Sequence, residues 1–201
     1  MWIYLIRHGE TNGNKDRILQ TPQTPLSARG QQQASQLAAS FKNTSASAIL
    51  CSSHVRTQQT AAPLGSQLQC PVILSDLLQE RSFGELRGRH YDDIQADFFA
   101  PDYHPPNGES HQQFAQRMSL AWQHIHDNAQ RVDGNLVVMT HGLVLRFILS
   151  EIVSIPQKQL AGVRFENTCV TQINKQDLSK VPMLCDVSHL QERPLASAGV
   201  V

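Results

Sequence analysis

Short apolar runs alternate with longer stretches of helical period along most of the chain. The apolar runs lie at residues 2–6, 46–51, 72–74, 135–139, 168–174 and 181–187, and each predicts a strand. The stretches between them place apolar residues three and four positions apart, as in the group Ala34, Leu37, Ala38 and Phe41. Strands that alternate with helices are typical of α/β proteins.

Several helix boundaries carry their own signals. Ser27 can cap a helix over residues 28–41, and Ser110 with Gln113 has the spacing of a capping box. The run LVLRFILSEIV at 143–153 is almost entirely apolar, which predicts a buried helix.

A further helix is expected to start near Ser53. Pro63 and Gly65 should kink or end it, because proline cannot donate the helical hydrogen bond and clashes with the preceding turn.

The regular pattern breaks down between residues 77 and 109, where helix breakers collect at Gly84, Gly88, Pro101, Pro105 and Pro106. Long irregular segments inside a compact domain are often lids or binding elements. The sequence therefore predicts one domain over residues 1–190 with a cap inserted at 77–109. A C-terminal tail at 191–201 is expected to fray.

The composition narrows the classes of function. Lys and Arg together number 17, as do Asp and Glu, so the chain lacks the basic excess of a general nucleic-acid binder. No apolar run is long enough to span a membrane, and the apolar stretch before Arg7 is too short for a secretion signal. The four cysteines form no C-x-x-C pair, which favours reduced thiols and a cytoplasmic location, although a Cys51–Cys70 disulfide stays open.

Two histidines stand at equivalent places in this pattern. His8 and His141 each follow an apolar strand and precede a glycine, Gly9 or Gly142. In open α/β sheets the ligand lies outside the carboxyl ends of the strands, so both imidazoles are expected at one site. The glycines would let the backbone approach a ligand closely.

Two arginines accompany these histidines. Arg7 ends the first strand, and Arg56 falls in the first turn of a helix, whose N-terminus favours anions. Guanidinium groups suit phosphoryl oxygens, so the cluster indicates a phosphate site, and a neutral imidazole at His8 is a competent nucleophile. A carboxyl group of raised pKa would supply the leaving group's proton; the candidates are Glu10, Glu80, Glu85 and Glu109.

Five blocks then follow one another over about residues 1–190: RHGET with Asn14, SSHVRTQQTA, LLQERSFGELRG, PPNGES and VVMTHGLVLR. Together they resemble the histidine phosphatase superfamily, the phosphoglycerate-mutase-like proteins. The resemblance implies a three-layer α/β/α sandwich around a mostly parallel sheet. It also implies a reaction that needs neither a metal nor a cofactor.

The resemblance further implies roles for single residues. His8 matches the histidine that becomes phosphorylated, and Glu80 matches the general acid that protonates the leaving oxygen and then activates water. Asn14 matches a polar contact to the phosphoryl group. The rest of the phosphate pocket is matched by Arg7, Arg56 and His141, next to Gly142.

Within the family, the chain is similar to the small phosphatases, the α-ribazole-phosphatase-like and fructose-bisphosphatase-like members, because the segment from Glu80 to NGES is short. We therefore expect a phosphatase that hydrolyses small phosphorylated metabolites through a phosphohistidine at His8. A phosphoglycerate mutase and a non-catalytic module that binds a phosphate ligand are the alternatives. The sequence leaves the physiological substrate and the oligomeric state open.

The other histidines and a basic cluster carry weaker signals. His54 could reach the pocket, but a solvent position is favoured, as it is for His90, His104 and His111. His124 and His126 are two positions apart on a helix and so point to different faces. A solvated face is also expected for Arg81, Arg87 and Arg89, with a second phosphate or carboxylate of the substrate as the alternative partner.

Overall fold

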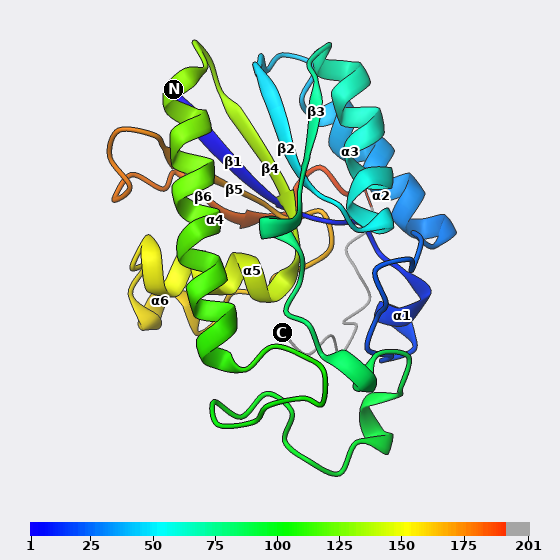
Figure 1. The fold of residues 1–201 in the computed structure, drawn as a ribbon. Helices are drawn as coiled ribbons and strands as arrows, with labels where there is room; N and C mark the ends of the chain where they lie inside the picture. Colours follow the sequence, from blue (N-terminus) through cyan, green and yellow to red (C-terminus); the bar gives the residue numbers. More distant parts are fainter. Residues whose placement is uncertain (192–201) are drawn as a thin grey trace.

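The computed structural model describes residues 1–191, which form a six-stranded sheet with helices on both sides (Figure 1). The strand order is β3-β2-β4-β1-β5-β6. The strands are β1 (Trp2–Arg7), β2 (Ala48–Ser52), β3 (Val72–Ser75), β4 (Leu136–Thr140), β5 (Val170–Asn174) and β6 (Met183–Asp186). Strands β1 to β4 pair with one another in parallel, whereas β5 pairs antiparallel with both β1 and β6.

The predicted strands are therefore confirmed within two residues at each end, and so is the mostly parallel sheet. The predicted tail at 191–201 lies outside the described residues apart from Gln191.

Four longer helical segments and two short ones complete the fold. The helices are α1 (Asn12–Lys15), α2 (Ala28–Ser40), α3 (Val55–Leu68), α4 (His111–Arg131), α5 (Gly142–Phe147) and α6 (Gln157–Leu160). The expected caps are confirmed: the Ser27 hydroxyl accepts the Gly30 N–H, and Ser110 with Gln113 forms the capping box of α4.

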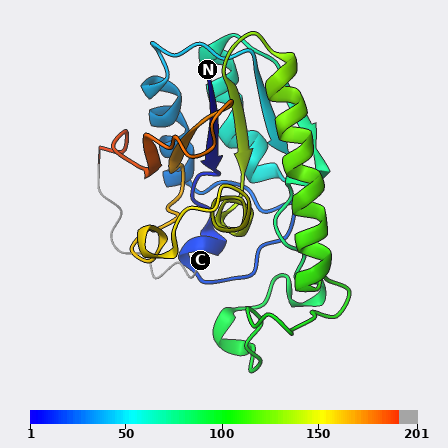
Figure 2. The ribbon, with the colours of Figure 1, turned by 90° about the vertical axis from the view of Figure 1, so that its left-hand side faces the viewer.

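Apolar residues alternate between the two faces of the sheet, and this alternation builds the layers. Leu136 and Val138 of β4 pack in the core on the side of α4 and α5. Val137 and Met139 pack in a second core on the side of α2 and α3. Figure 2 shows the sheet between these two helical layers, which confirms the three-layer α/β/α sandwich.

Pro63 and Gly65 were expected to kink or end α3, and the expected end is wrong, because the helix continues to Leu68. Ala61 and Leu64 of this helix are fully buried against the sheet, so tertiary packing outweighs the cost of an interior proline. Gly65 has a separate reason to be glycine. A Cβ there would lie 2.9 Å from Cγ2 of Val72, so α3 could not pack as closely on β3.

The predicted helix at 143–153 is buried, but its geometry changes along its length. The α-helical part ends at Phe147, and residues Ile148–Ile152 form a π-helical turn with Ile148 and Leu149 fully buried.

The irregular segment at 77–109 contains three single 3₁₀ turns, Asp76–Leu78, Gly84–Leu86 and Tyr91–Asp93. It lies beyond the carboxyl ends of the central strands, beside the loop that follows α1 (Figure 1). Backbone hydrogen bonds join the two, from Leu19 N–H to the Arg89 carbonyl at 3.0 Å and from Tyr91 N–H to the Arg17 carbonyl at 2.8 Å. The segment is thus attached to the edge of the sheet where both histidines emerge.

Candidate active site

The register of the sheet brings His8 and His141 together. Arg7 and Thr140 are paired residues of the parallel strands β1 and β4, so the next residue on each strand is a histidine at the same edge. The two imidazole rings have their centroids 5.2 Å apart, and both side chains are buried. The predicted meeting of the two histidines at one site is confirmed.

Arg56 links the two imidazoles. It lies in the first turn of α3, as predicted, and is itself buried. Its Nε–H donates to Nε2 of His8 at 3.2 Å, and its second amino group donates to Nδ1 of His141 at 3.2 Å. Burial lowers the pKa of Arg56 to about 10, so the guanidinium stays charged at neutral pH.

The hydrogen bonds also fix the tautomer of each ring. Because Arg56 can only donate, Nε2 of His8 and Nδ1 of His141 both carry lone pairs. Nδ1–H of His8 donates to the Gly9 carbonyl at 2.7 Å, and Nε2–H of His141 donates to the Ser52 hydroxyl at 2.8 Å. Burial, and next the charge of Arg56, hold the pKa of both histidines well below the ordinary value, so both rings are neutral at neutral pH.

Backbone contacts aim the His8 side chain. The His8 N–H donates to the Thr140 carbonyl at 3.0 Å, and the Gly9 N–H donates to the Thr60 hydroxyl at 2.9 Å. Gly9 was expected to let the backbone approach a ligand, but the structure shows another reason for a glycine. A Cβ at Gly9 would lie 2.7 Å from the Gly30 carbonyl oxygen. Gly9 lets this loop pack against the start of α2, and that close packing is what requires a glycine there.

Glu80 lines the same cavity as His8. One carboxylate oxygen accepts the Arg81 N–H at 3.0 Å, and the other accepts the Leu143 N–H at 3.1 Å, which ties the residue to the start of α5. Burial raises the pKa of Glu80 above its ordinary value. Of the four carboxyl groups considered as the proton donor, Glu10 is engaged elsewhere, because it accepts a hydrogen bond from Ser27 at the start of α2.

An arginine on α4 holds the backbone that carries Glu80. Arg117 donates to the carbonyl oxygens of Leu77 and Gln79, both at 2.8 Å, and pairs with both oxygens of Glu109 at 2.7 and 2.8 Å. Glu109 in turn accepts the Ser82 N–H at 2.8 Å. The segment on either side of Glu80 is therefore fixed by one partly buried ion pair.

We expect Arg117→Met to lower the free energy of unfolding by about 2–4 kcal/mol, because it removes the charged partner of Glu109 and the donor of two carbonyl groups. The rate of turnover should fall as well, since Glu80 loses its fixed position. Urea denaturation and kcat measure the two effects. Arg131→Met, an exposed position on the same helix, is the matched control, and equal unfolding curves for the two variants would contradict the role of Arg117.

One cavity contains most of the predicted residues. It is lined by Arg7, His8, Asn14, Arg56 and Glu80, together with residues that the sequence did not point to: Arg17, Leu19, Gln20, His54, Arg81, Phe83, Arg87, Tyr91, Phe99 and Leu143. Its volume of about 60 Å³ has room for about four water-sized groups. A phosphoryl group fits this space.

Arg7 and Asn14 line the cavity with groups that remain free to bind. Arg7 donates to the Phe165 carbonyl through one amino group, while its buried Nε has no partner among the described residues. Oδ1 of Asn14 accepts from Thr11 in the capping box of α1, which leaves its amide N–H groups for a ligand. Gly142 is buried at the start of α5, next to His141.

Two expectations about solvent are wrong. His54 is only 2% exposed and lines the cavity, and the centroid of its ring lies 4.8 Å from that of His141. Arg81 is only 3% exposed, because the segment at 77–109 folds over it and its guanidinium donates to the carbonyls of Tyr103 and Glu109. Of the three arginines, Arg89 is exposed as expected and donates to the Asp93 carbonyl.

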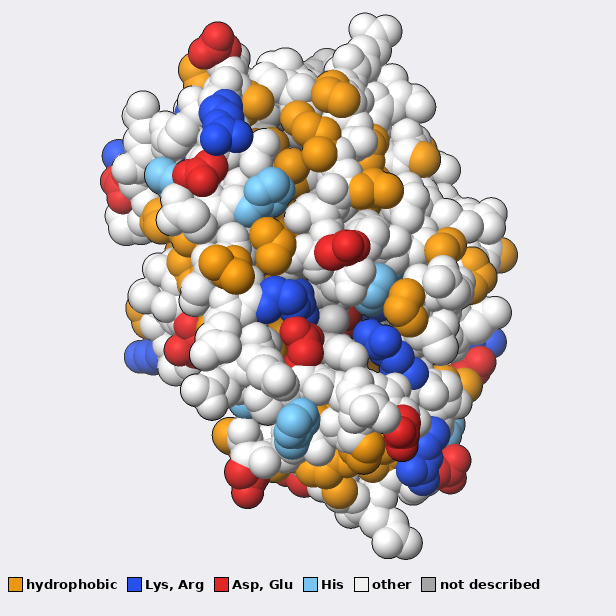
Figure 3. Space-filling view, in the orientation of Figure 1, with side chains coloured by type: hydrophobic (Ala, Val, Ile, Leu, Met, Phe, Trp, Pro, Cys, Tyr) orange, Lys and Arg blue, Asp and Glu red, His pale blue; other side chains and the backbone are white. Residues whose placement is uncertain are grey.

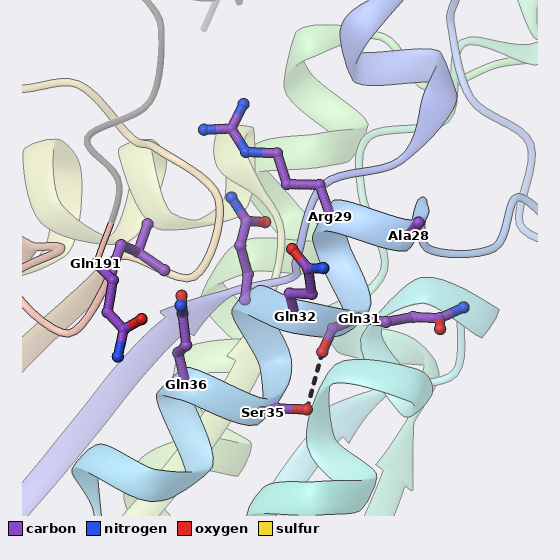
Figure 4. Close-up of a pocket in the computed structure, with 9 residues that line it drawn as sticks. Ala28, Arg29, Gln31, Gln32, Ser35, Gln36 and Gln191 are labelled. Atoms are coloured by element: carbon purple, nitrogen blue, oxygen red, sulfur yellow. Dashed lines mark hydrogen bonds between the residues drawn. The ribbon is translucent and has the colours of Figure 1, made fainter.

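Other features of the described residues add no second catalytic set. A wider hollow along α2 is lined mainly by glutamines, with Arg29 as its cation, and Figure 4 shows these side chains around it. Within residues 1–191 no three His, Cys, Asp or Glu side chains are grouped as metal ligands, and no helix there could cross a membrane. All four cysteines are free thiols.

A mostly parallel sheet, covered on both faces, brings a neutral His8, two arginines and a carboxyl of raised pKa to one cavity, with His141 packed behind His8 and Arg56. Such a site defines a protein that handles phosphoryl groups. The model of the histidine phosphatase superfamily (branch 1) matches residues 3–181. The chain belongs to this superfamily.

Some similar proteins are named as phosphoglycerate mutases and others as phosphatases. The chain is 31% identical to the probable phosphoglycerate mutase GpmB of Enterobacter sp. (strain 638) over an alignment of 205 positions that covers 94% of each chain. The crystal structure of the alpha-ribazole phosphatase from Shigella flexneri superposes with a TM-score of 0.79 and 29% identity over 92% of this chain and 96% of that one. The structure of Bacillus stearothermophilus YhfR gives a TM-score of 0.80 at 27% identity over 94% and 98%.

Proposed function

We propose that the protein is a phosphatase that hydrolyses small phosphorylated metabolites through a phosphohistidine at His8. The observation that carries the proposal is the single cavity in which a neutral His8 and a protonatable Glu80 face the same space, with Arg7 and Arg56 beside them. Phosphoryl transfer needs a nucleophile in line with the leaving oxygen, neutralised phosphoryl oxygens and a proton for the leaving group. These residues can supply all three.

In the first step, Nε2 of His8 attacks phosphorus and the bond from phosphorus to the ester oxygen breaks, while Glu80 gives its proton to that oxygen. In the second step, the Glu80 carboxylate takes a proton from water, the water oxygen attacks phosphorus, and the bond to His8 breaks to release phosphate. Arg56 donates to both imidazoles in the free protein, so its N–H groups must turn to the phosphoryl oxygens when the substrate binds. His141, Asn14, Gly142 and the guanidinium of Arg7 would complete the phosphate pocket.

A phosphoglycerate mutase is the second candidate, because the relative from Enterobacter carries that name. The two activities share the same phosphohistidine and differ in whether water or a sugar acid takes the phosphoryl group. A binding module without catalysis is less favoured, since a binder has no use for a neutral nucleophile opposite a proton donor. The cytoplasmic location and the absence of a metal requirement stay predictions.

The purified protein is expected to hydrolyse p-nitrophenyl phosphate without added metal, at a rate that EDTA does not change. Arginines carry the positive charge of the proposed pocket, so chelation should remove nothing that the reaction needs. A panel of phosphorylated metabolites then identifies the substrate, and an assay of phosphoglycerate isomerisation with bisphosphoglycerate tests the mutase. Loss of hydrolysis in EDTA with recovery on adding magnesium would overturn the mechanism.

A further inference from the structure

Arg87 is a cation that the proposed chemistry leaves unused. It lines the catalytic cavity and is partly buried, yet its guanidinium has no hydrogen-bond or ion-pair partner among the described residues. Burying part of a charge without a partner is unfavourable, so a group that arrives with the substrate is the natural partner.

A second hollow adjoins the catalytic cavity at this arginine. It is lined by Asp76, Leu77, Gln79, Glu80, Ser82, Arg87, Glu109 and Arg117, so Glu80 and Arg87 belong to both spaces. Figure 3 shows the face concerned, where basic, acidic and histidine side chains gather around a depression between α4 and the segment that follows β3. Glu80 therefore stands at the junction between the space for the phosphoryl group and this hollow.

The other charges of the hollow already have partners. Glu109 is paired with Arg117 through both of its oxygens. Asp76 accepts hydrogen bonds from Ser53 and from Gln79, the latter at 2.8 Å. Arg87 is thus the charge that is left to bind a ligand.

His54 gives a second, independent indication of a ligand. It is 98% buried from solvent, lines the catalytic cavity, and neither ring nitrogen has a partner among the described residues. Buried polar groups are normally hydrogen-bonded, so each such nitrogen calls for an explanation. Burial, and next the charges of Arg56 and Arg87, lower the pKa of His54 to about 3, which leaves a neutral ring that can donate one hydrogen bond.

We propose that the leaving group of the substrate occupies the hollow beyond Glu80, and that Arg87 binds a second anionic group on it, a carboxylate or a second phosphate. The inference rests on the proposed function, because a general acid must stand against the leaving oxygen. The leaving group then extends past Glu80, away from His8, into the space that Arg87 faces.

Three aryl esters of similar leaving-group acidity test the inference: phenyl phosphate, 3-carboxyphenyl phosphate and 1,3-phenylene bisphosphate. The wild-type protein should show a higher kcat/KM for at least one of the two esters with a second anion. Arg87→Gln should lower the ratio of kcat/KM for that ester to kcat/KM for phenyl phosphate by about 10–100-fold, the range for a charge-assisted hydrogen bond. Arg87→Lys should restore part of this ratio. The ester whose ratio falls in Arg87→Gln, the carboxylate or the bisphosphate, identifies the anion that Arg87 binds.

Arg89→Gln is the matched control, because it removes the same charge from the same segment at a residue that lines neither space. Its ratio should equal that of the wild type. An unchanged ratio in Arg87→Gln, or the same change in Arg89→Gln, would overturn the inference while leaving the proposed function intact. If the wild type hydrolyses none of the three esters, the proposed function is overturned, and the inference with it.

Discussion

Replacing His8 by alanine is expected to reduce phosphatase turnover by about 10⁴-fold or more, because no other group in the cavity can take its place as the nucleophile. His141 does not line the cavity, and Ser52 and Arg56 engage both of its nitrogens. His54 lines the cavity, but within the described residues no hydrogen bond at either ring nitrogen orients it for attack. Neither is placed to substitute for His8.

The measurement should separate loss of the nucleophile from loss of the fold. Initial rates with p-nitrophenyl phosphate give the first, and a urea unfolding curve gives the second. A ³²P-labelled substrate quenched in alkali should leave label on the wild type, as a phosphohistidine that acid removes, and none on His8→Ala.

His126→Ala is the matched control, since this histidine lies on α4 and contacts Gln130 on the outer side of the helix. The control should retain the wild-type rate and the label. If His8→Ala hydrolyses the ester at a rate comparable to that of the control, the nucleophile has been assigned to the wrong residue.

The sequence predicts the part of the site that the sheet positions. His8, His141 and Arg56 follow β1, β4 and β2, three neighbouring parallel strands whose apolar runs are plain in the sequence. Parallel strands in register deliver the residues after their carboxyl ends to one edge, so local pattern and a general rule of topology suffice there.

The remaining part of the site depends on contacts between distant segments, which no local pattern shows. Arg81 is buried because Tyr103, 22 residues later, folds back to accept its hydrogen bond. Arg87 faces the cavity because the neighbouring Gly88 N–H bonds to the Leu19 carbonyl at 2.6 Å, and Gly88 has a positive φ of 87°. These pairings fix the path of the segment at 77–109, and the charges of its side chains alone do not reveal it.

His54 illustrates the same limit within a single element. It lies two residues before Arg56, and a polar residue at the start of a helix usually faces solvent. In the structure its side chain makes no capping bond and packs on His141 instead. The stretch SSHVR alone does not distinguish these two orientations, because the outcome depends on β4.

The second large effect concerns Glu80. Glu80→Gln keeps the size of the side chain but removes its proton, so kcat/KM should fall by about 10²–10⁴-fold for an ester with a poor leaving group such as phenyl phosphate. The loss should be smaller for p-nitrophenyl phosphate, because its leaving oxygen needs less help from a proton. Glu85→Gln is the matched control: Glu85 lies in the same segment, accepts from Asn107 at 2.6 Å and lines neither space. Similar rates for the two variants would exclude Glu80 as the acid.

The pH dependence sharpens this test. Burial raises the pKa of Glu80, and the first step needs the protonated form, so the wild-type rate should fall as the pH rises through that raised pKa. Titration of His8 does not change the rate over the same pH range, since its pKa is held well below the ordinary value and the ring stays neutral. Ionisation of the substrate affects wild type and Glu80→Gln alike, so the ratio of their kcat/KM values isolates Glu80. This ratio should be large at low pH and decline towards high pH, whereas a ratio that does not vary with pH would assign the proton to another group.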